Sequence, residues 1–232
     1  MISTQLSPSP HSKSQSVKTR SVLVVDDHPV FRHGLCLFLE QLPEVVVCGE
    51  ASNAQSALEH MRRLRPDIVI MDICMPGMNG IELVKHMLAE QPKLLILMLS
   101  SYDESLYALR ALRAGSKGYV TKQQVMEQIL EALKKIMDGG IYVSPEFREK
   151  LVFKAISGST GDDASPVDKL SDREMEVLQL FGQGKTTREI SETLRLSTKT
   201  VETHRSHIKE KLGFGSAEEL MRFAVEWMTA KA

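Results

Sequence analysis

LRPDIVIMDICMPGMNG, residues 64–80, runs four apolar residues straight into a carboxylate, and Met-Pro-Gly and Asn-Gly follow. The apolar run, residues 68–71, has the length of a short buried strand, and the Pro, Gly and Asn residues after it are typical of a tight turn. Two interpretations fit Asp72. A buried strand simply ends there, since acidic residues are common at strand ends, or the strand presents Asp72 at the rim of a sheet for use. The rest of the chain decides between them.

Similar apolar runs recur before and after this one. Short β-branched or aliphatic runs lie at residues 22–25, 45–47, 68–71, 94–99 and 118–120. Segments with helical spacing separate them, with apolar positions at Val30, Leu35, Phe38 and Leu42 in the first and at Ala54, Ala57, Leu58, Met61 and Leu64 in the second. Nearly continuous apolar strands are buried on both faces, which predicts a parallel sheet with helices on each side. We therefore predict an α/β doubly wound (βα)5 domain over residues 21–140.

Size and composition restrict the class of protein. The 232 residues are enough for two small domains, and 42% hydrophobic and 25% charged residues are ordinary for a soluble globular chain. No apolar run approaches the ~18 residues that cross a bilayer. Residues 1–20 lack the apolar core of a signal peptide, so we expect a disordered tail there and no membrane contact. Three cysteines without a C-x-x-C pair favour a reduced, cytoplasmic setting.

The chain changes character after residue 140. Ser144 and Pro145 are typical of a helix start, and the helix is predicted to continue to residue 156. Residues 157–166 show no apolar periodicity and predict a flexible linker, so that residues 141–166 form a linker helix followed by a flexible linker.

Beyond the linker, capping residues predict short helices. Three S/T-x-x-E capping boxes begin at Ser171, Thr186 and Ser216, and Ser197 is suited to be a further N-cap. Residues 167–230 are therefore predicted to be a small all-α domain of four helices.

Reactive side chains follow four of the predicted strands. Asp26 and Asp27 follow the first, Asp72 the third, Ser100 ends the fourth, and Lys122 comes after the fifth. In an open parallel sheet, ligands bind outside the carboxyl ends of the strands, so these groups are expected at one edge. The agreement of four strand ends favours the functional interpretation of Asp72.

The clustered carboxylates suggest a cation and a phosphoryl group. Each close carboxylate pair costs roughly 4 kcal/mol at an effective dielectric of about 20, and a bound cation relieves that repulsion. Oxygen ligands with no His or Cys side chain directed at them favour Mg²⁺. Such an ion can neutralise an incoming phosphoryl group, with Asp72 as the nucleophile and with Lys122 and Ser100 bound to phosphoryl oxygens.

The strings VLVVDDHP, IVIMDICMPGMNG, ILMLSSYDE and AGSKGYVTK resemble the receiver domain of bacterial two-component response regulators. The resemblance implies that Asp72 is the phosphoacceptor, fed by a sensor histidine kinase. It implies that Asp26, Asp27, Asp72 and the backbone carbonyl of Cys74 hold Mg²⁺. Ser100 and Tyr119 would be the switch pair, and Lys122 would pair with the phosphate. His28, beside the acidic pair, is interpreted as a surface or packing residue.

The second half of the chain has helix-turn-helix spacing at residues 187–206. Residues 185–211 hold seven basic and four acidic residues, a local charge of +3 in a chain with a net charge of −1. Ile190, Leu194, Val201 and Ile208 supply the predicted buried face, on which His204 also lies as a structural residue. The fuller string LSDREMEVLQLFGQGKTTREISETLRLSTKTVETHRSHIKEKLG resembles the LuxR-type (GerE-like) output domain, and with the receiver it gives the architecture of NarL/FixJ-type response regulators.

The recognition helix of that motif supplies the candidate DNA contacts. Glu202, Thr203 and Ser206 are the expected base contacts, and Lys199, Arg205 and Lys209 the expected phosphate contacts. The full set of predicted DNA-binding residues is Thr187, Thr198, Lys199, Thr200, Glu202, Thr203, Arg205, Ser206 and Lys209. So few basic residues support only a few phosphate contacts per copy, which favours a homodimer on two promoter half-sites of double-stranded DNA.

We therefore predict a phosphorylation-dependent transcriptional regulator that is not a conventional enzyme. One alternative is a regulator whose receiver works without phosphorylation, as an adaptor or dimerisation module. The other is a phosphoaspartyl phosphatase, which would be expected to carry a second Asp two residues after the nucleophile, where this chain has Cys74.

Overall fold

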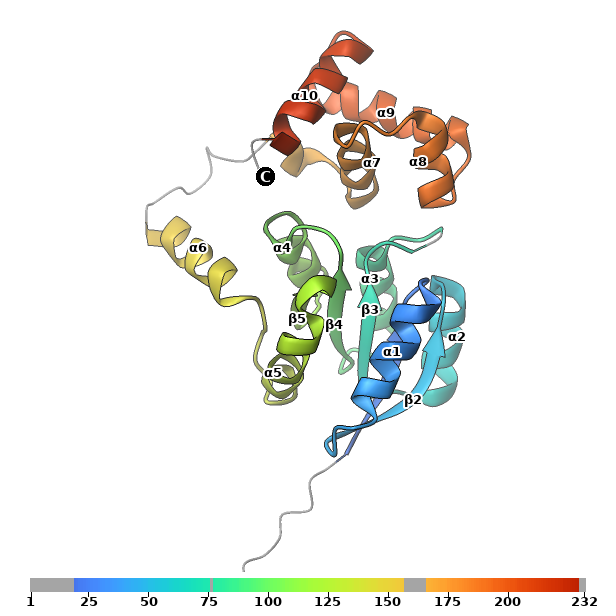
Figure 1. Cartoon of the computed structure of the whole chain (residues 1–232), viewed down its shortest axis with the longest axis vertical. Coiled ribbons are helices and arrows are strands. Elements are labelled where there is room, and N and C mark those ends of the chain that lie inside the picture. The colour runs from blue at the N-terminus through green and yellow to red at the C-terminus, as the bar shows by residue number, and fades with distance from the viewer. Residues whose placement is uncertain (1–18, 76, 157–165, 230–232) are drawn as a thin grey trace, which may run out of the picture.

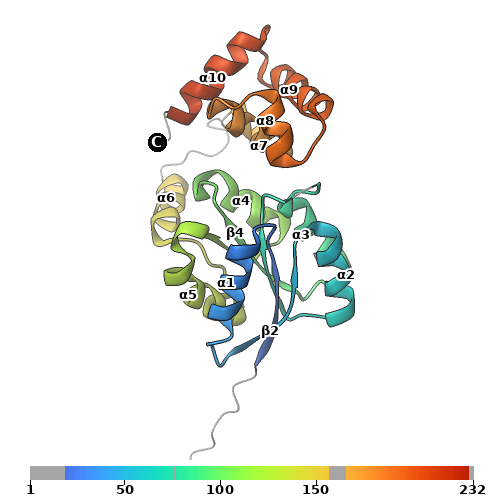
Figure 2. The same cartoon turned by 45° about the vertical axis from the view of Figure 1, so that its right-hand side comes forward.

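The computed structural model describes residues 19–75, 77–156 and 166–229, which form an α/β domain and a smaller helical domain packed against its upper end (Figures 1 and 2). The predicted disordered tail falls outside the described residues up to residue 18. The predicted flexible linker also falls outside them over residues 157–165.

The first domain is built on one parallel sheet in the order β2-β1-β3-β4-β5. The strands are β1 (Arg20–Val25), β2 (Val45–Ala51), β3 (Ile68–Asp72), β4 (Leu95–Ser100) and β5 (Gly118–Thr121). All four strand pairings are parallel. Consecutive strands therefore need crossovers, which the helices between them provide.

Helices cover both faces of the sheet, as the continuous apolar strands predict. Side chains alternate along β3, where Val69 and Met71 pack on the side of α2 (Ala54–Leu64), α3 (Gly80–Glu90) and α4 (Glu104–Ala114). Ile68 and Ile70 pack on the side of α1 (Pro29–Leu39) and α5 (Val125–Met137). The prediction of a doubly wound α/β domain is confirmed.

One predicted core position on α1 is wrong. Val30 is 86% exposed, and the helix buries Leu35, Cys36 and Leu39 instead. Val30 lies in the first turn of α1, just after the N-cap residue His28, where it lines an open hollow.

The ends of the first domain extend slightly past the predicted boundaries. Arg20 is already part of β1, since it pairs with Val45 and donates to Asp67. After α5 the chain returns to the sheet, where Tyr142 pairs with Gly118 in a parallel bridge and is 1% exposed. Helix α6 (Pro145–Ile156) then begins as predicted, with Ser144 Oγ accepting a hydrogen bond from the Phe147 N–H.

Four helices form the second domain, as predicted: α7 (Asp172–Gly182), α8 (Thr187–Leu194), α9 (Thr198–Leu212) and α10 (Ala217–Thr229). Short 3-10 turns, η1 (Lys122–Gln124) and η2 (Pro166–Lys169), precede α5 and α7. The capping boxes at Ser171, Thr186 and Ser216 are all present, each with reciprocal hydrogen bonds to the Glu three residues later. Among the helices that the structure describes, none is both long and apolar enough to cross a membrane.

Candidate functional site

The carboxyl edge of the sheet brings the predicted acidic and basic residues together. Asp72 is the last residue of β3, Asp26 follows β1 directly, and both are almost fully buried. Lys122, the first residue after β5, places Nζ 2.6 Å from Asp72 Oδ2 and 2.7 Å from Asp26 Oδ2. The sheet order places β3 between β1 and β4, so residues that follow β1 and β5 reach the end of β3 at Asp72.

Burial and charge control the protonation of this cluster. Burial raises the pKa of Asp72 to about 6; Lys122 opposes the shift and the charge of Asp26 adds to it. Burial alone would lower the pKa of Lys122, but the carboxylates of Asp72 and Asp26 outweigh it and raise that pKa. The ammonium is therefore retained at neutral pH between two carboxylates.

The acidic residues fit a hard divalent cation. Asp26, Asp27 and Asp72 each offer an oxygen in one group whose ligand atoms lie within 4.8 Å of one another. Asp26 Oδ2 pairs with Lys122 Nζ at 2.7 Å and Asp27 Oδ1 lies beside His28 Nδ1, and these contacts leave each carboxylate with further lone pairs for a cation. The same group includes His28, whose Nδ1 lies 2.8 Å from Asp27 Oδ1. The expectation that no His side chain is directed at the carboxylates is therefore wrong, because His28, the N-cap residue of α1, directs its Nδ1 at Asp27.

Cys74 lies in the turn after β3. Its N–H donates to Asp72 Oδ1 at 3.2 Å, and its thiol accepts from the Tyr102 hydroxyl at 3.5 Å. Its role as a carbonyl ligand stays a prediction.

The predicted switch residues converge on Tyr102. Ser100 is fully buried, and its Oγ accepts a hydrogen bond from the Tyr102 N–H. Tyr119 points inward and donates from its hydroxyl to the Tyr102 carbonyl at 2.9 Å. The Tyr102 ring stacks on Tyr107, with centroids 4.9 Å apart. Tyr102 thus joins both predicted switch residues to α4.

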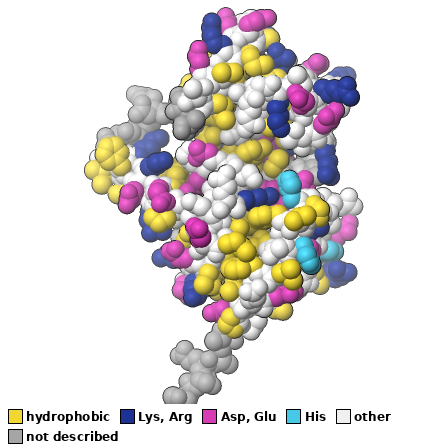
Figure 3. All heavy atoms as spheres, in the orientation of Figure 1, with side chains coloured by type: hydrophobic (Ala, Val, Ile, Leu, Met, Phe, Trp, Pro, Cys, Tyr) yellow, Lys and Arg dark blue, Asp and Glu magenta, His cyan; other side chains and the backbone are white. Residues whose placement is uncertain are grey.

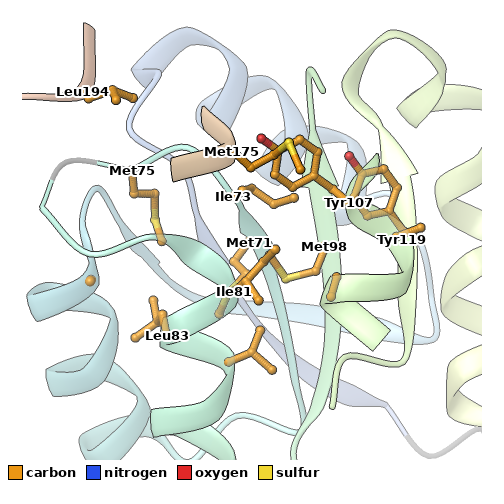
Figure 4. Close-up of a cluster of buried hydrophobic side chains, with 14 of the residues drawn as sticks. Met71, Ile73, Met75, Ile81, Leu83, Met98, Tyr107, Tyr119, Met175 and Leu194 are labelled. Carbon is orange, nitrogen blue, oxygen red and sulfur yellow. The ribbon is translucent and has the colours of Figure 1, made fainter. Parts of the chain in front are cut away.

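Helix α7 of the second domain docks on the same edge of the first. Asn79, at the end of the loop that follows β3, donates to Glu176 Oε1 at 2.6 Å, and Tyr107 donates to Gln179 at 2.8 Å. Arg173 pairs with Glu176 and also donates to the Gly77 carbonyl. Figure 4 shows Met175 beside Tyr107 and above Ile73, within one continuous apolar cluster.

Arg110 on α4 anchors the segment that precedes α7. Its guanidinium donates to the carbonyls of Val167 and Leu170 and pairs with Asp172. Sequence reasoning missed this interface. A signal exists for α7, because Met175, Val177, Leu178, Leu180 and Phe181 surround the helix axis and leave no wide polar face.

The docked contact is expected to weaken as pH rises. Burial raises the pKa of Glu176 from 4.5 to about 7; Arg173 opposes the shift and Asp72 adds to it. A carboxyl with a raised pKa stabilises the docked form below pH 4.5, and this contribution is lost as pH rises through 7. We expect the docking equilibrium constant to fall roughly ten-fold between pH 6 and pH 8.

Small-angle X-ray scattering of the full chain at the two pH values measures this change as a larger population of extended molecules. Glu176→Gln carries no titrating proton at this position and should flatten the dependence. An unchanged pH dependence in Glu176→Gln would contradict the assignment to Glu176.

The predicted DNA-binding residues are all at least partly exposed. Those exposed to solvent are Thr198, Lys199, Glu202, Thr203 and Ser206, and those partly buried are Thr187, Thr200, Arg205 and Lys209. A groove of about 320 Å³ runs between Glu202, Arg205, Ser206 and Lys209 of α9 and Ala217 and Leu220 of α10. The docked second domain thus leaves its predicted base-reading residues uncovered.

Arg205 and His204 of α9 are both partly buried. The Arg205 guanidinium lies 5.1 Å from the centre of the Phe181 ring, a cation–π contact that positions it at the edge of the helix. His204 is partly buried, and burial lowers its pKa. This position agrees with the structural role predicted for His204.

Comparisons with known proteins match both domains. Residues 22–134 match the family described as "Response regulator receiver domain", and residues 168–224 match "Bacterial regulatory proteins, luxR family". Response regulator GacA of Pseudomonas aeruginosa is 35% identical over 204 residues, 88% of this chain and 94% of that protein. Oxygen regulatory protein NreC of Staphylococcus aureus is 34% identical over 209 residues, 88% of this chain and 96% of that protein.

Solved structures give the same result. The RcsB response regulator of Salmonella typhimurium has a TM-score of 0.64 and 27% identity, over 90% of this chain and 98% of that one. A complex of RcsB with DNA has a TM-score of 0.55 and 27% identity, over 88% of this chain and 97% of that one.

Proposed function

Because the chain belongs to the NarL/FixJ-type two-component response regulators, transcriptional regulators with a receiver domain and a LuxR-type DNA-binding domain, we propose that phosphorylation of Asp72 by a sensor histidine kinase controls its dimerisation and DNA binding. The observation that carries this proposal is the meeting of Asp72, Asp26 and Lys122 at one edge of the sheet. The chemistry requires a nucleophile, a cation site and a second positive charge in one place.

Phosphoryl transfer to Asp72 forms a P–O bond to its carboxylate and breaks the P–N bond of the kinase phosphohistidine. The histidine nitrogen keeps the electron pair of the broken bond. Asp26, Asp27, Asp72 and the Cys74 carbonyl would hold Mg²⁺, which would neutralise charge on the phosphoryl oxygens. Lys122, already 2.6 Å from Asp72, pairs with one phosphoryl oxygen. Ser100 donates a hydrogen bond from its hydroxyl group to another phosphoryl oxygen, and Tyr119 responds as the second member of the switch pair.

Intact-protein mass spectrometry after incubation with Mg²⁺ and a small acyl-phosphate donor tests the acceptor. We expect a single phosphoryl adduct on wild type and none on Asp72→Asn, because an amide nitrogen is not a nucleophile for this transfer. An adduct of equal yield on Asp72→Asn would place the acceptor elsewhere. If wild type takes no adduct and also binds no beryllofluoride, the regulator works without phosphorylation.

An exposed apolar surface of the receiver domain lies beside this site, and we propose that the kinase docks there. His28, Val30, Phe31, Ser101, Lys122 and Gln123 line a hollow of about 510 Å³. Val30 is 86% and Met126 57% exposed, and Figure 3 shows apolar side chains gathered on the face that carries α1 and α5. An apolar helix face bearing the phosphohistidine would cover Val30 and direct its phosphoryl group toward Asp72.

DNA recognition is proposed to use the exposed side of α9. Glu202 can accept a hydrogen bond from a cytosine N4 amine in the major groove. We expect Glu202→Ala to lose roughly 1–3 kcal/mol of preference for one base at one half-site position, with non-specific affinity nearly unchanged. Titrations of duplexes carrying each base at every half-site position measure this preference. A base preference identical to that of wild type would exclude Glu202 as a base reader.

A further inference from the structure

The interface between the two domains places a carboxylate of α7 against the loop that follows the proposed phosphoacceptor. Glu176 is fully buried, and its charge acts on Cys74 in the loop after β3. Together with burial, it raises the pKa of Cys74, and Asp72 in turn raises that of Glu176. The second domain therefore holds a negative charge inside the electrostatic field of the acidic cluster.

The loop after β3 and one hydrogen bond connect Asp72 to Glu176. Asp72 accepts a hydrogen bond from the Cys74 N–H, and the loop that starts there ends at Asn79, which donates to Glu176. Asn79 is 3% exposed, and its Oδ1 also caps α3 by accepting from the Ile81 N–H. The loop is thus fixed at both ends and cannot move away from Glu176 without breaking these contacts.

The positive charge available to Glu176 is limited. Arg173 is its ion-pair partner, but the same guanidinium also serves the carbonyls of Gly77 and Leu194. Asn79 and the nearby tyrosines are neutral. Buried charges are screened far less than exposed ones, so an added negative charge at Asp72 acts on Glu176 even though Lys122 and a bound cation offset part of it.

We propose that Glu176 is the residue by which the DNA-binding domain senses the phosphoryl group, through repulsion that releases α7 from the receiver. This inference rests on the proposed phosphorylation of Asp72. The modification replaces a carboxylate of charge −1 by an acyl phosphate of charge close to −2. The added charge disfavours only the docked form, in which Glu176 lies nearby, so it shifts the equilibrium toward release.

The exposure of the recognition helix α9 indicates what the release of α7 changes. Because Glu202, Thr203 and Ser206 are already exposed in the docked form, release does not uncover the base-reading residues. It frees the second domain to take the position that a paired half-site requires. The buried side of α7, rather than the recognition helix, is the part that the receiver restrains.

Two variants of one residue separate charge from packing. Glu176→Gln removes the charge and keeps the length of the side chain. Glu176→Asp keeps the charge and shortens the side chain by one methylene. Hydrogen–deuterium exchange of the peptide 172–182 is measured in the full chain at pH 8 with Mg²⁺, with and without beryllofluoride, a dianionic phosphoryl mimic once bound to a carboxylate. The readout is the ratio of the two exchange rates.

In wild type we expect this ratio to be on the order of ten. In Glu176→Asp the ratio stays close to the wild-type value, and in Glu176→Gln it falls toward one. Tyr107→Phe serves as the matched control, since it loses the hydrogen bond to Gln179 in the same interface without a change of charge. Its exchange is faster in both conditions, with the ratio retained.

The inference is overturned if Glu176→Gln responds as wild type does, or if Glu176→Asp and Glu176→Gln lose the response equally. Occupancy of Asp72 by beryllofluoride is read separately by ¹⁹F NMR. A failure of the proposed function appears there as missing occupancy, whereas a failure of the sensor appears as full occupancy with an unchanged exchange pattern.

Discussion

Gly80→Ala should lower the free energy of unfolding by about 3 kcal/mol or more, because the added methyl has no room. A Cβ at residue 80 would lie 2.2 Å from the Asp72 carbonyl oxygen and 2.8 Å from the Ile73 Cα. Both atoms belong to the backbone at the end of β3, so no side chain can turn aside. Relief requires that α3 move away from the strand end that carries the acidic cluster.

Urea denaturation of wild type and Gly80→Ala measures this loss. Gly34→Ala is the matched control, since its Cβ would meet nothing within 4 Å on the exposed side of α1. It should gain roughly 0.5–1 kcal/mol from the higher helix propensity of alanine. A Gly80→Ala protein as stable as wild type would show that β3 and α3 can separate without cost.

Lys122→Met is the second variant with a large expected effect. The ammonium of Lys122 lies between Asp72 and Asp26, and all three side chains are at least nine-tenths buried. Removing one partner of a buried ion pair leaves an uncompensated charge and costs about 3–5 kcal/mol. We expect this loss in metal-free protein at pH 8, where nothing else neutralises the carboxylates.

Millimolar Mg²⁺ should restore part of the lost stability in Lys122→Met, because a cation bound only to the folded state stabilises it. Thermal unfolding with a chelator and with added Mg²⁺ measures both effects. Arg188→Met is the control, since Arg188 pairs with Glu192 on the solvent-exposed side of α8. It should change neither stability nor the response to Mg²⁺. If Lys122→Met keeps wild-type stability in the chelator, Lys122 does not compensate the acidic cluster.

The sequence predicts those features that follow from local periodicity and from topology. Nearly continuous apolar runs predict the strands, and a parallel sheet brings residues at strand ends such as Asp72 and Lys122 to one edge whatever the details of packing. The capping boxes are predictable because a Ser or Thr and a Glu three residues later satisfy each other. The capping contacts join residues three positions apart, and the site residues lie at equivalent positions, the carboxyl ends of parallel strands.

Features that depend on how surfaces meet could not be predicted in this way. Glu176 and Asn79 are 97 residues apart, and a glutamate on a helix usually faces solvent. Val30 fits the apolar period of α1 but lies in its exposed first turn, and periodicity alone does not show where a helix leaves the core. The return of His28 over Asp27 depends on the turn geometry at the start of α1, which residue type alone does not determine.

Arg110 holds η2 against the receiver domain, and once these contacts break the linker limits how far the DNA-binding domain can move. Nine residues, 157–165, join the end of α6 to η2, and a chain of that length spans at most about 30 Å. When the hydrogen bonds from Arg110 to the Val167 and Leu170 carbonyls are broken, the linker still keeps the two domains close. Each domain then experiences the other at an effective concentration on the order of 10 mM. Under such tethering even a weak interface is mostly closed, and a modest change in its free energy is enough to open it.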